Sequence, residues 1–384
     1  MQSYLPVYKD RPERGWREGP IYDVWLTLPV LFLVGIGIVM VYSASSTLAL
    51  KKFGTDYYFL KRQLVYSVGG CLLLILFRHM PIRILRAGVY PLLFGTLLLL
   101  AAVQIPGLGI TAGGATRWLY LGAFSFQPSE LARLALVVYL AYSMEKKGDL
   151  IKTFSVGFVP HVIILGVFVG LIMLQPDFGS AGILCVIAGG LMFMGGVRLR
   201  YLMLSILAVL PVAYLVLVNS AYRWKRIMSF WDPWQYASNE GYQAIHSLMA
   251  FGTGGIWGVG VGGGYQKLFY LPEPHTDFIF SVIGEELGLI GVLAVMTCYG
   301  VILWRGMNIA RNAGGRFVSL VAAGLTFSLG LQVIINMGVA LALLPTKGLT
   351  LPLLSYGGSS LLVNMAGIGL LMNISAGEKH VPTA

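Results

Sequence analysis

Ionisable residues are rare in this sequence, and several of them stand in short polar motifs beside long apolar runs. In one motif, residues 271–280, His275, Thr276 and Asp277 follow two prolines. Asp277 could act as a catalytic carboxylate that takes a proton from an attacking hydroxyl. Thr276 or Asp277 could also be the N-cap of the helix that follows, because both residue types are good N-caps. The two interpretations are compatible, and the sequence leaves both open.

A pair of adjacent acids, Glu285 and Glu286, follows inside the next apolar run. On a helix they would lie about 12 Å along the axis from Asp277. Neighbouring residues point to different faces of a helix, so at least one of the two carboxylates must face a cavity or a cation. Catalysis and structural pairing are equally compatible with this pattern.

Two more motifs place acids at the start of apolar runs. Pro128 suits the first position of a helix, and Glu130 lies in its first turn, where the helix dipole favours an acid. Arg133, three residues after Glu130, can pair with it or bind an anion. Asp177 either caps the next helix or has a buried role.

The last polar motif, residues 346–360, contains a single cation, Lys347, and many small residues, among them Ser355. Small residues allow close packing of membrane helices. Lys347 could also hold a phosphate, because it is the only cation in the motif.

The elements that must position these residues are long apolar segments. Of the 384 residues, 57% are hydrophobic and 11% are charged, whereas about 25% are charged in soluble domains. The segments are too long and too uniformly apolar for barrel strands. We predict an all-α polytopic integral membrane protein with about ten transmembrane helices, at residues 24–45, 64–77, 87–104, 128–144, 157–174, 178–196, 201–219, 282–304, 316–337 and 352–375.

The predicted organisation is a cytoplasmic tail at 1–23, one membrane domain at 24–375, and a cytoplasmic tail at 376–384. Lys and Arg are more frequent in the segments that are cytoplasmic when the N-terminus is inside, as the positive-inside rule requires. Residues 1–23 lack the apolar core of a cleavable signal peptide. On this topology one large loop, residues 221–281, lies outside the membrane between the seventh and eighth helices.

This loop begins with Arg223 and Arg226 among tryptophans, a composition that suits a helix in the headgroup layer. Eight glycines between residues 252 and 264 follow, which predicts a mobile or tightly turning backbone. The stretch lacks the preceding strand and the Gly-Lys-Ser/Thr of a phosphate-binding loop. We therefore expect no nucleotide or organic cofactor.

Composition also argues against other classes of protein. The net charge of +11 follows from the positive-inside rule, and no soluble basic face is available for nucleic acid. The three cysteines have no spacing typical of a disulfide framework or a zinc site. Little of the chain remains for a soluble catalytic domain.

Together the motifs resemble the SEDS family, named for shape, elongation, division and sporulation. The resemblance extends over about residues 20–375 and is carried, in order, by residues 117–119, 126–130, 175–179, 275–280, 285–288 and 352–359. The basic stretch that begins at Lys347 resembles the cell-division branch and its sporulation relative, since the elongation branch is usually less basic there. We take the cell-division branch as the most similar.

The resemblance implies a peptidoglycan glycosyltransferase in the bacterial cytoplasmic (inner) membrane. Such an enzyme polymerises lipid II, an undecaprenyl-pyrophosphate disaccharide-pentapeptide, into glycan strands at the outer face, here for septal wall synthesis. The implied partners are a class B penicillin-binding transpeptidase and other divisome proteins. The candidate catalytic residues are Asp277, Glu285 and Glu286, and the candidate substrate-binding residues are Arg117, Glu130, Arg133, Asp177, Arg223, Arg226, His275, Thr276, Lys347 and Ser355.

One base can suffice for an inverting transfer from such a donor, because pyrophosphate leaves without being protonated. Asp277 is the candidate base. The leaving charge needs cations instead, and a divalent cation, Mg²⁺ or Mn²⁺, is a candidate for that task beside the basic residues. The sequence names no metal ligands, although Asp277 with Glu285 or Glu286 could contribute.

Three alternatives remain open. A lipid II flippase or transporter would also use acids and broken helices, but its acids would be reachable from both sides of the membrane. A scaffold that only recruits a transpeptidase would not need Asp277. The elongation branch would use the same chemistry for a different part of the wall.

Overall fold

The computed structural model describes residues 22–112, 114–122, 124–219, 221–237, 241–346 and 348–377. In this part of the chain ten helices coincide with the ten predicted segments, so the fold class is confirmed. They are α1 (Val24–Phe53), α2 (Tyr58–His79), α4 (Val89–Ala102), α5 (Pro128–Lys147), α6 (Val159–Met173), α7 (Phe178–Met194), α8 (Leu199–Val218), α12 (Ile279–Asn312), α13 (Arg316–Ala340) and α14 (Gly358–Ala376).

Most of these helices have the length and apolarity of membrane spans. In the described residues, six helical segments are long and apolar enough to cross a membrane, and α4, α7 and part of α8 are shorter apolar helices. The exception, α5, carries more charge but is buried along nearly its whole length. It packs against α4, α7 and α13, so its charged side chains face protein rather than lipid.

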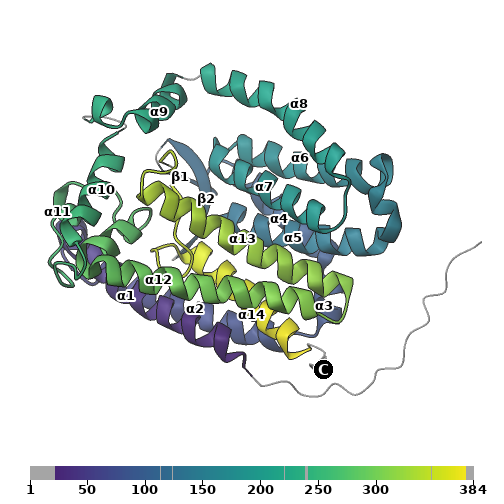
Figure 1. The fold of residues 1–384 in the computed structure, drawn as a ribbon, viewed down its shortest axis with the longest axis horizontal. Helices are drawn as coiled ribbons and strands as arrows, with labels where there is room; N and C mark the ends of the chain where they lie inside the picture. Colours follow the sequence, from purple (N-terminus) through teal and green to yellow (C-terminus); the bar gives the residue numbers. More distant parts are fainter. Residues whose placement is uncertain are drawn as a thin grey trace, which may run out of the picture.

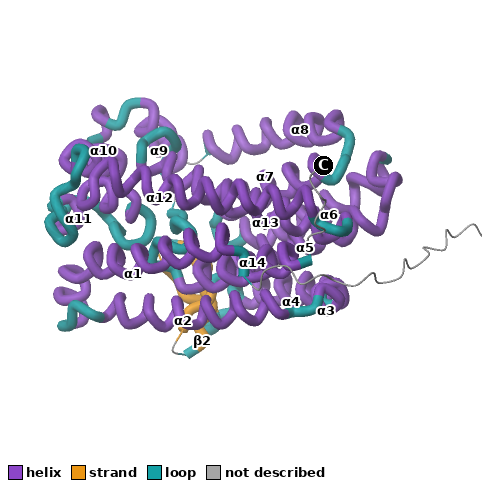
Figure 2. Tube along the Cα trace, turned by 60° about the horizontal axis from the view of Figure 1, so that its bottom comes forward, coloured by secondary structure: helices purple, strands orange, loops and turns teal. Residues whose placement is uncertain are grey.

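The long helices form a bundle in which most of them run in roughly the same or the opposite direction (Figure 2). Helices α1, α2, α12 and α14 lie together on one side, with α4 to α7 on the other and α13 between the two groups (Figure 1). Helix α8 lies along the outer edge and exposes a row of apolar side chains: Leu199, Met203, Leu204, Leu207, Leu210 and Leu215. Such a surface suits contact with lipid tails.

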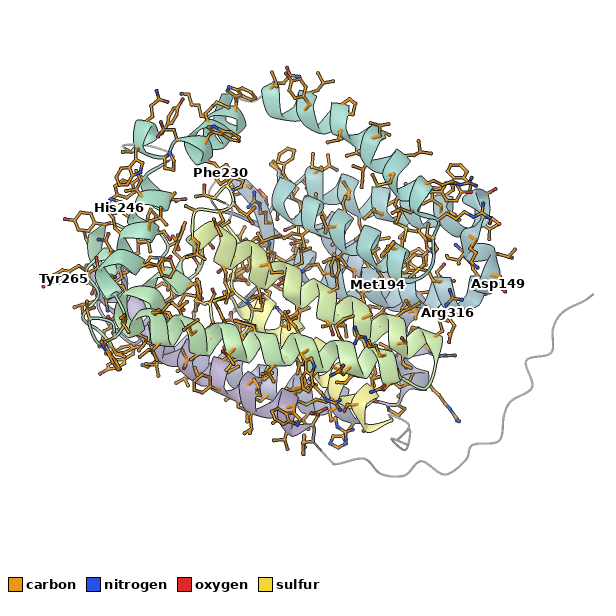
Figure 3. The ribbon with its side chains drawn as sticks, viewed as in Figure 1. Asp149, Met194, Phe230, His246, Tyr265 and Arg316 are labelled. Atoms are coloured by element: carbon orange, nitrogen blue, oxygen red, sulfur yellow. The ribbon has the colours of Figure 1, made fainter. Side chains whose placement is uncertain are left out.

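One end of the bundle is tied by ion pairs between segments that we predicted to be cytoplasmic. Arg86 pairs with Glu145 at 2.7 Å, and Arg305 pairs with Asp23 at 2.6 Å. Asp23 is also the N-cap of α1. Figure 3 shows Asp149 and Arg316 at this end, whereas His246 and Tyr265 lie at the other.

The described parts of the predicted outer segments meet at the opposite end. There the large loop contains three helices, α9 (Ala221–Trp231), α10 (Tyr242–Gly254) and α11 (Gln266–Phe269). The predicted helix at the start of the loop is therefore present as α9. The structure thus separates the two sets of segments as the charge pattern requires.

Some short elements were not predicted from the sequence. An antiparallel sheet is formed by β1 (Gly109–Ala112), β2 (Ala115–Leu121) and β3 (Phe124–Phe126), in the order β1-β2-β3. Helix α3 (Ile82–Ala87) precedes α4, and single turns of 3₁₀ or π-helix occupy Gly148–Lys152, Phe154–Phe158 and Trp234–Tyr236. These elements connect the long helices, and the transmembrane part of the fold remains all-α.

Helix α12 is broken at Gly288, which has φ 64° and ψ −163°. The glycine-rich stretch satisfies the backbone groups around this break. Peptide N–H groups of residues 289–290 donate to carbonyls of residues 255–256, and those of 259–260 donate to carbonyls of 285–286, over 2.9–3.3 Å. The sequence predicts either a mobile or a tightly turning backbone for this stretch. The structure shows a tightly turning backbone that is hydrogen-bonded to α12.

Candidate functional site

Asp277 lies in a turn just before α12 and does not cap the helix. The N-cap position belongs to Phe278, whose own side chain makes no capping hydrogen bond. Both Asp277 and Thr276 donate their backbone N–H to the carbonyl of Glu273, at 3.2 Å, and the Thr276 hydroxyl donates to the same carbonyl at 3.1 Å. The N-cap interpretation of these two residues is therefore wrong, because the turn places them before the helix starts.

Asp277 is a partly exposed residue, and its carboxylate lies against a second loop. A Cβ atom built on Gly348 would be 3.1 Å from Asp277 Oδ2. The Asn336 amide joins the same two loops, because its Nδ2 donates to the carbonyl of Asp277 at 3.0 Å and to that of Leu349 at 2.5 Å. Lys347, which precedes Gly348 in the sequence, lies outside the described residues.

Ser355 belongs to this second loop, and its hydrogen bonds stabilise the turn of residues 351–355. Its hydroxyl accepts the N–H of Leu351 at 2.8 Å, and its own N–H donates to the carbonyl of Leu351 at 3.0 Å. The next residue, Tyr356, donates its N–H to the carbonyl of His275 at 2.9 Å. The predicted substrate-binding Ser355 is thus a buried loop residue, and the loops that carry it and Asp277 are bonded to each other.

The His275 side chain is buried and packs between two aromatic rings. Its side chain is 3% exposed, with ring centroids 4.6 Å from Phe59 and 5.6 Å from Tyr356. Burial, and secondarily the charge of Lys52, lowers the pKa of His275 to about 4. The imidazole is therefore neutral near pH 7, and its geometry suits support of the Asp277 turn.

Glu285 is fully buried and holds the end of the glycine-rich stretch. Its Oε1 accepts the backbone N–H of Tyr265 at 2.7 Å and that of Gln266 at 3.1 Å. A carboxylate that accepts two backbone N–H groups acts as a fixed anchor for that backbone.

Glu286 is 1% exposed and forms an ion pair with Lys267, whose exposure is 9%. It also accepts the hydroxyl of Ser43 at 2.8 Å and the N–H of Gly262 at 3.1 Å. The geometry therefore favours structural pairing for both glutamates. Among the described residues, no three His, Cys, Asp or Glu side chains gather as metal ligands. The prediction that Asp277 contributes to a metal site with Glu285 or Glu286 stays a prediction.

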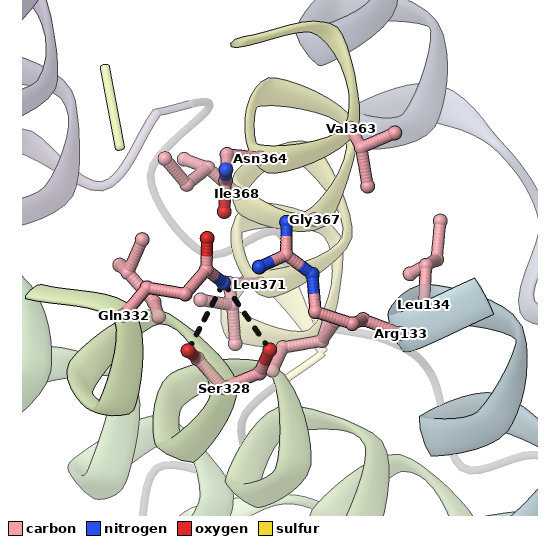
Figure 4. Close-up of a pocket in the computed structure, with 11 residues that line it drawn as sticks. Arg133, Leu134, Ser328, Gln332, Val363, Asn364, Gly367, Ile368 and Leu371 are labelled. Atoms are coloured by element: carbon pink, nitrogen blue, oxygen red, sulfur yellow. Dashed lines mark hydrogen bonds between the residues drawn. The ribbon is translucent and has the colours of Figure 1, made fainter. Parts of the chain in front are cut away.

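Glu130 and Arg133 form the predicted ion pair on α5, and both side chains are buried. Arg133 lines a cavity of about 30 Å³ between α5, α13 and α14 (Figure 4), room for about two waters. Gln332 and Asn364 also line it, and Gln332 donates to the carbonyl of Ser328 at 3.1 Å. The charge of Arg133 is balanced inside the bundle, which argues against it as a free anion-binding group.

Asp177 caps α7, as one of its two interpretations predicts. Its carboxylate accepts the N–H of Ser180 at 3.1 Å and the Ser180 hydroxyl at 2.7 Å. Arg117, on β2, approaches the same carboxylate at 3.8 Å and donates to the carbonyl of Pro176 at 2.8 Å. Arg117 and Asp177 therefore join the small sheet to α7.

The side chains of Arg223 and Arg226, on α9, lie outside the described residues, as does the whole of Lys347. Sequence reasoning missed Asn336, Lys267 and Ser43 as residues that hold the site. Asn336 had a detectable signal, since a polar amide inside an apolar run needs a partner. Lys267 and Ser43 had none, because their link to Glu286 exists only in the folded chain.

Sequence comparison gives close relatives over the whole length. A protein of Geobacter metallireducens named probable peptidoglycan glycosyltransferase FtsW is 45% identical over 361 residues, covering 94% of this chain and 96% of the relative. A protein of the same name from Legionella pneumophila is 43% identical over 357 residues, covering 92% of this chain and 91% of the relative.

Structure comparison finds similar folds. Thermus thermophilus rod shape determining protein RodA matches with a TM-score of 0.68 and 31% identity, over 92% of this chain and 96% of that one. A chain from a peptidoglycan synthase complex that coordinates polymerization and crosslinking matches with a TM-score of 0.75 and 32% identity, over 92% and 97%. The family described as "Cell cycle protein", which comprises FtsW, RodA and SpoVE, matches residues 24–380. This chain belongs to the FtsW, RodA and SpoVE family.

Proposed function

We propose that Asp277 is the general base of a glycosyltransferase that polymerises lipid II into peptidoglycan glycan strands. The chain is a peptidoglycan glycosyltransferase of the cell-division type, as its relatives of 42–46% identity are named. The assignment of Asp277 as the base rests on a difference in burial among the three acids. Asp277 is partly exposed where two loops meet, while Glu285 and Glu286 are buried on structural partners.

The proposed reaction needs one proton acceptor. Asp277 takes the proton from the attacking sugar hydroxyl of the acceptor, and the new glycosidic bond forms at the anomeric carbon of the donor with inversion. The bond from that carbon to the pyrophosphate breaks, and the electron pair leaves with the undecaprenyl pyrophosphate. This leaving group needs no proton, so a second carboxylate is not required.

The leaving charge needs cations on the face of the donor sugar opposite Asp277, because the transfer inverts the anomeric carbon. Lys347 is a proposed residue on its sequence position alone. Arg223 and Arg226 remain proposals on their sequence alone. Arg117 and Arg133 already face Asp177 and Glu130, which makes them poor candidates.

A divalent cation was expected beside these cations. Among the described residues no cluster of three metal-binding side chains occurs, and Glu285 and Glu286 have other partners. Mg²⁺ is commonly bound by one or two carboxylates together with substrate phosphates, so a divalent cation held by Asp277 and the donor pyrophosphate stays a proposal, and the steps above are written for the residues of the chain alone. Dependence of the rate on Mg²⁺ or Mn²⁺ remains a property to be measured with substrate present.

The chain is a multi-pass membrane protein, and we propose the bacterial inner membrane with both termini in the cytoplasm. The two sets of connecting segments at opposite ends of the bundle support this orientation. A class B penicillin-binding transpeptidase is the proposed partner. Its support is the likeness to a chain of a synthase complex that coordinates polymerization and crosslinking. Other divisome proteins are further proposed partners.

The test uses purified protein in liposomes with lipid II and Mg²⁺, with and without a co-purified transpeptidase. Wild type and Asp277→Asn are compared for glycan products on a gel, with lipid II binding as the control. We expect polymer from wild type and none from the folded, lipid-binding variant. Equal polymer from both would remove Asp277 as the base. Absence of polymer from either would favour the flippase or scaffold alternatives.

A further inference from the structure

Asn336 is a buried amide that connects two loops. It lies near the end of α13 with 2% of its surface exposed. Its Nδ2 donates to the carbonyls of Asp277 and Leu349, which are 59 and 13 residues away in the sequence. Only the NH₂ side of the amide can donate, so two carbonyl partners fix which way the amide points.

The two carbonyls belong to the segments on which the proposed base depends. One is the carbonyl of Asp277 itself, and the other follows Gly348, against which the Asp277 carboxylate lies. Removing the amide would release both carbonyls from a common donor in a buried environment. Misplacement of a catalytic group by about 1 Å can cost about 100-fold in rate.

We propose that Asn336 is a positioning residue for the glycosyl transfer. Its amide holds the Asp277 peptide against residues 348–349, so that the carboxylate stays where the acceptor hydroxyl arrives. Asn336 itself touches no reacting atom. This inference rests on the proposed role of Asp277 as base, and it adds a residue that the polar motifs of the sequence did not include.

The chain offers a matched control in Asn373 on α14. Its Nδ2 also donates to two backbone carbonyls, those of Phe77 at 3.0 Å and Met80 at 2.6 Å. These bonds tie α14 to the end of α2, at the end of the bundle that holds the Arg305 and Asp23 pair. Loss of the Asn373 amide therefore costs the same kind of bonds without touching the site.

The experiment compares Asn336→Leu and Asn373→Leu in full-length protein with lipid II as the probe. Melting temperature, lipid II affinity, and the rate per lipid-binding molecule are measured for each. We expect both variants to lose thermal stability. Asn336→Leu lowers kcat by about 100-fold at unchanged lipid II affinity, whereas Asn373→Leu keeps kcat within a few-fold of wild type. Equal kcat values in the two variants would overturn the inference.

Asn336→Ala serves where Asn336→Leu does not fold, because it removes the donors and introduces neither a longer side chain nor an ionisable group. It should lose kcat as Asn336→Leu does, and a kcat equal to wild type would overturn the inference. Asp277→Asn is assayed in parallel. An active Asp277→Asn contradicts the proposed base. An inactive Asp277→Asn beside a fully active Asn336 variant contradicts the positioning role alone.

Discussion

At the scale of single residues, burial separates three acids that stand close together in the sequence. Asp277 is partly exposed, whereas Glu285 and Glu286 are 0% and 1% exposed. The sequence identified all three but could not divide their roles, because the partners Lys267 and Ser43 are brought to Glu286 only by folding. The opposite holds for Glu130 and Arg133, whose pairing follows from a spacing of three residues on one helix.

The Glu286–Lys267 pair gives the first prediction at this scale. Glu286→Leu leaves the Lys267 ammonium buried without its partner, and we expect a loss of about 3–5 kcal/mol in unfolding free energy. Lys267→Met should cost a similar amount. The double variant should recover most of the loss, because no unpaired charge remains. Unfolding in detergent measures this cycle, and additive losses in the double variant would contradict a direct pair.

His275 gives a prediction of pH dependence. Its pKa is lowered to about 4 in the fold, against about 6.5 in the unfolded chain, so below pH 6.5 the unfolded chain binds a proton that the folded chain does not. Stability should therefore fall as the pH drops from about 6.5 to about 4, by up to about 3 kcal/mol. Thermal unfolding across this range measures the effect. His275→Gln should flatten this part of the profile, and parallel curves for variant and wild type would contradict the assignment.

At the scale of elements, apolar length predicted where the long helices lie, but not their ends or the short elements. The last span was expected from residue 352, yet α14 begins at Gly358, because Leu353 has φ 69° and residues 352–357 form a loop. The sheet of residues 109–126 was missed because its strands are short and lie between apolar runs. Its register, such as Leu119 opposite Phe126, depends on contacts that no local pattern encodes.

Gly288 gives the prediction at this scale. A Cβ atom there would overlap backbone atoms of Ile256 and Gly258, and its φ of 64° is unfavourable for other residues. Gly288→Ala should therefore destabilise the protein by at least about 1–3 kcal/mol and detach the glycine-rich stretch. Gly300→Ala, in open space on the same helix, should change stability by less than about 1 kcal/mol. Similar melting temperatures for the two variants would argue against the close approach.

At the scale of the whole molecule, the charge pattern predicted which segments meet at each end of the bundle. Arg86 with Glu145 and Arg305 with Asp23 mark one end. The 271–278 and 348–357 loops mark the other. The sequence could sort segments into two sets because Lys and Arg follow the sides of the membrane. It could not predict which loops touch, since those contacts depend on how ten helices pack.

Labelling with a membrane-impermeant maleimide tests the proposed orientation. The background has Cys71, Cys185 and Cys298 replaced by alanine, since all three are free. Trp257→Cys, at a position that is 80% exposed in the large loop, should react in intact cells. Leu150→Cys, at a position that is 57% exposed at the opposite end, should react only after permeabilisation. The reverse result would invert the topology and place Asp277 inside the cell.

Asp277 is the acid to which we assign the chemistry, whereas Glu285 and Glu286 hold the structure around it. The most direct measurement is lipid II polymerisation per folded, lipid-binding molecule for Asp277→Asn and Glu285→Gln, with melting temperatures measured on the same samples. We predict that Asp277→Asn keeps its stability and lipid II binding but makes no glycan. Glu285→Gln should lose stability first and retain polymerisation in its folded fraction. Glycan made by Asp277→Asn at the wild-type rate would contradict the account.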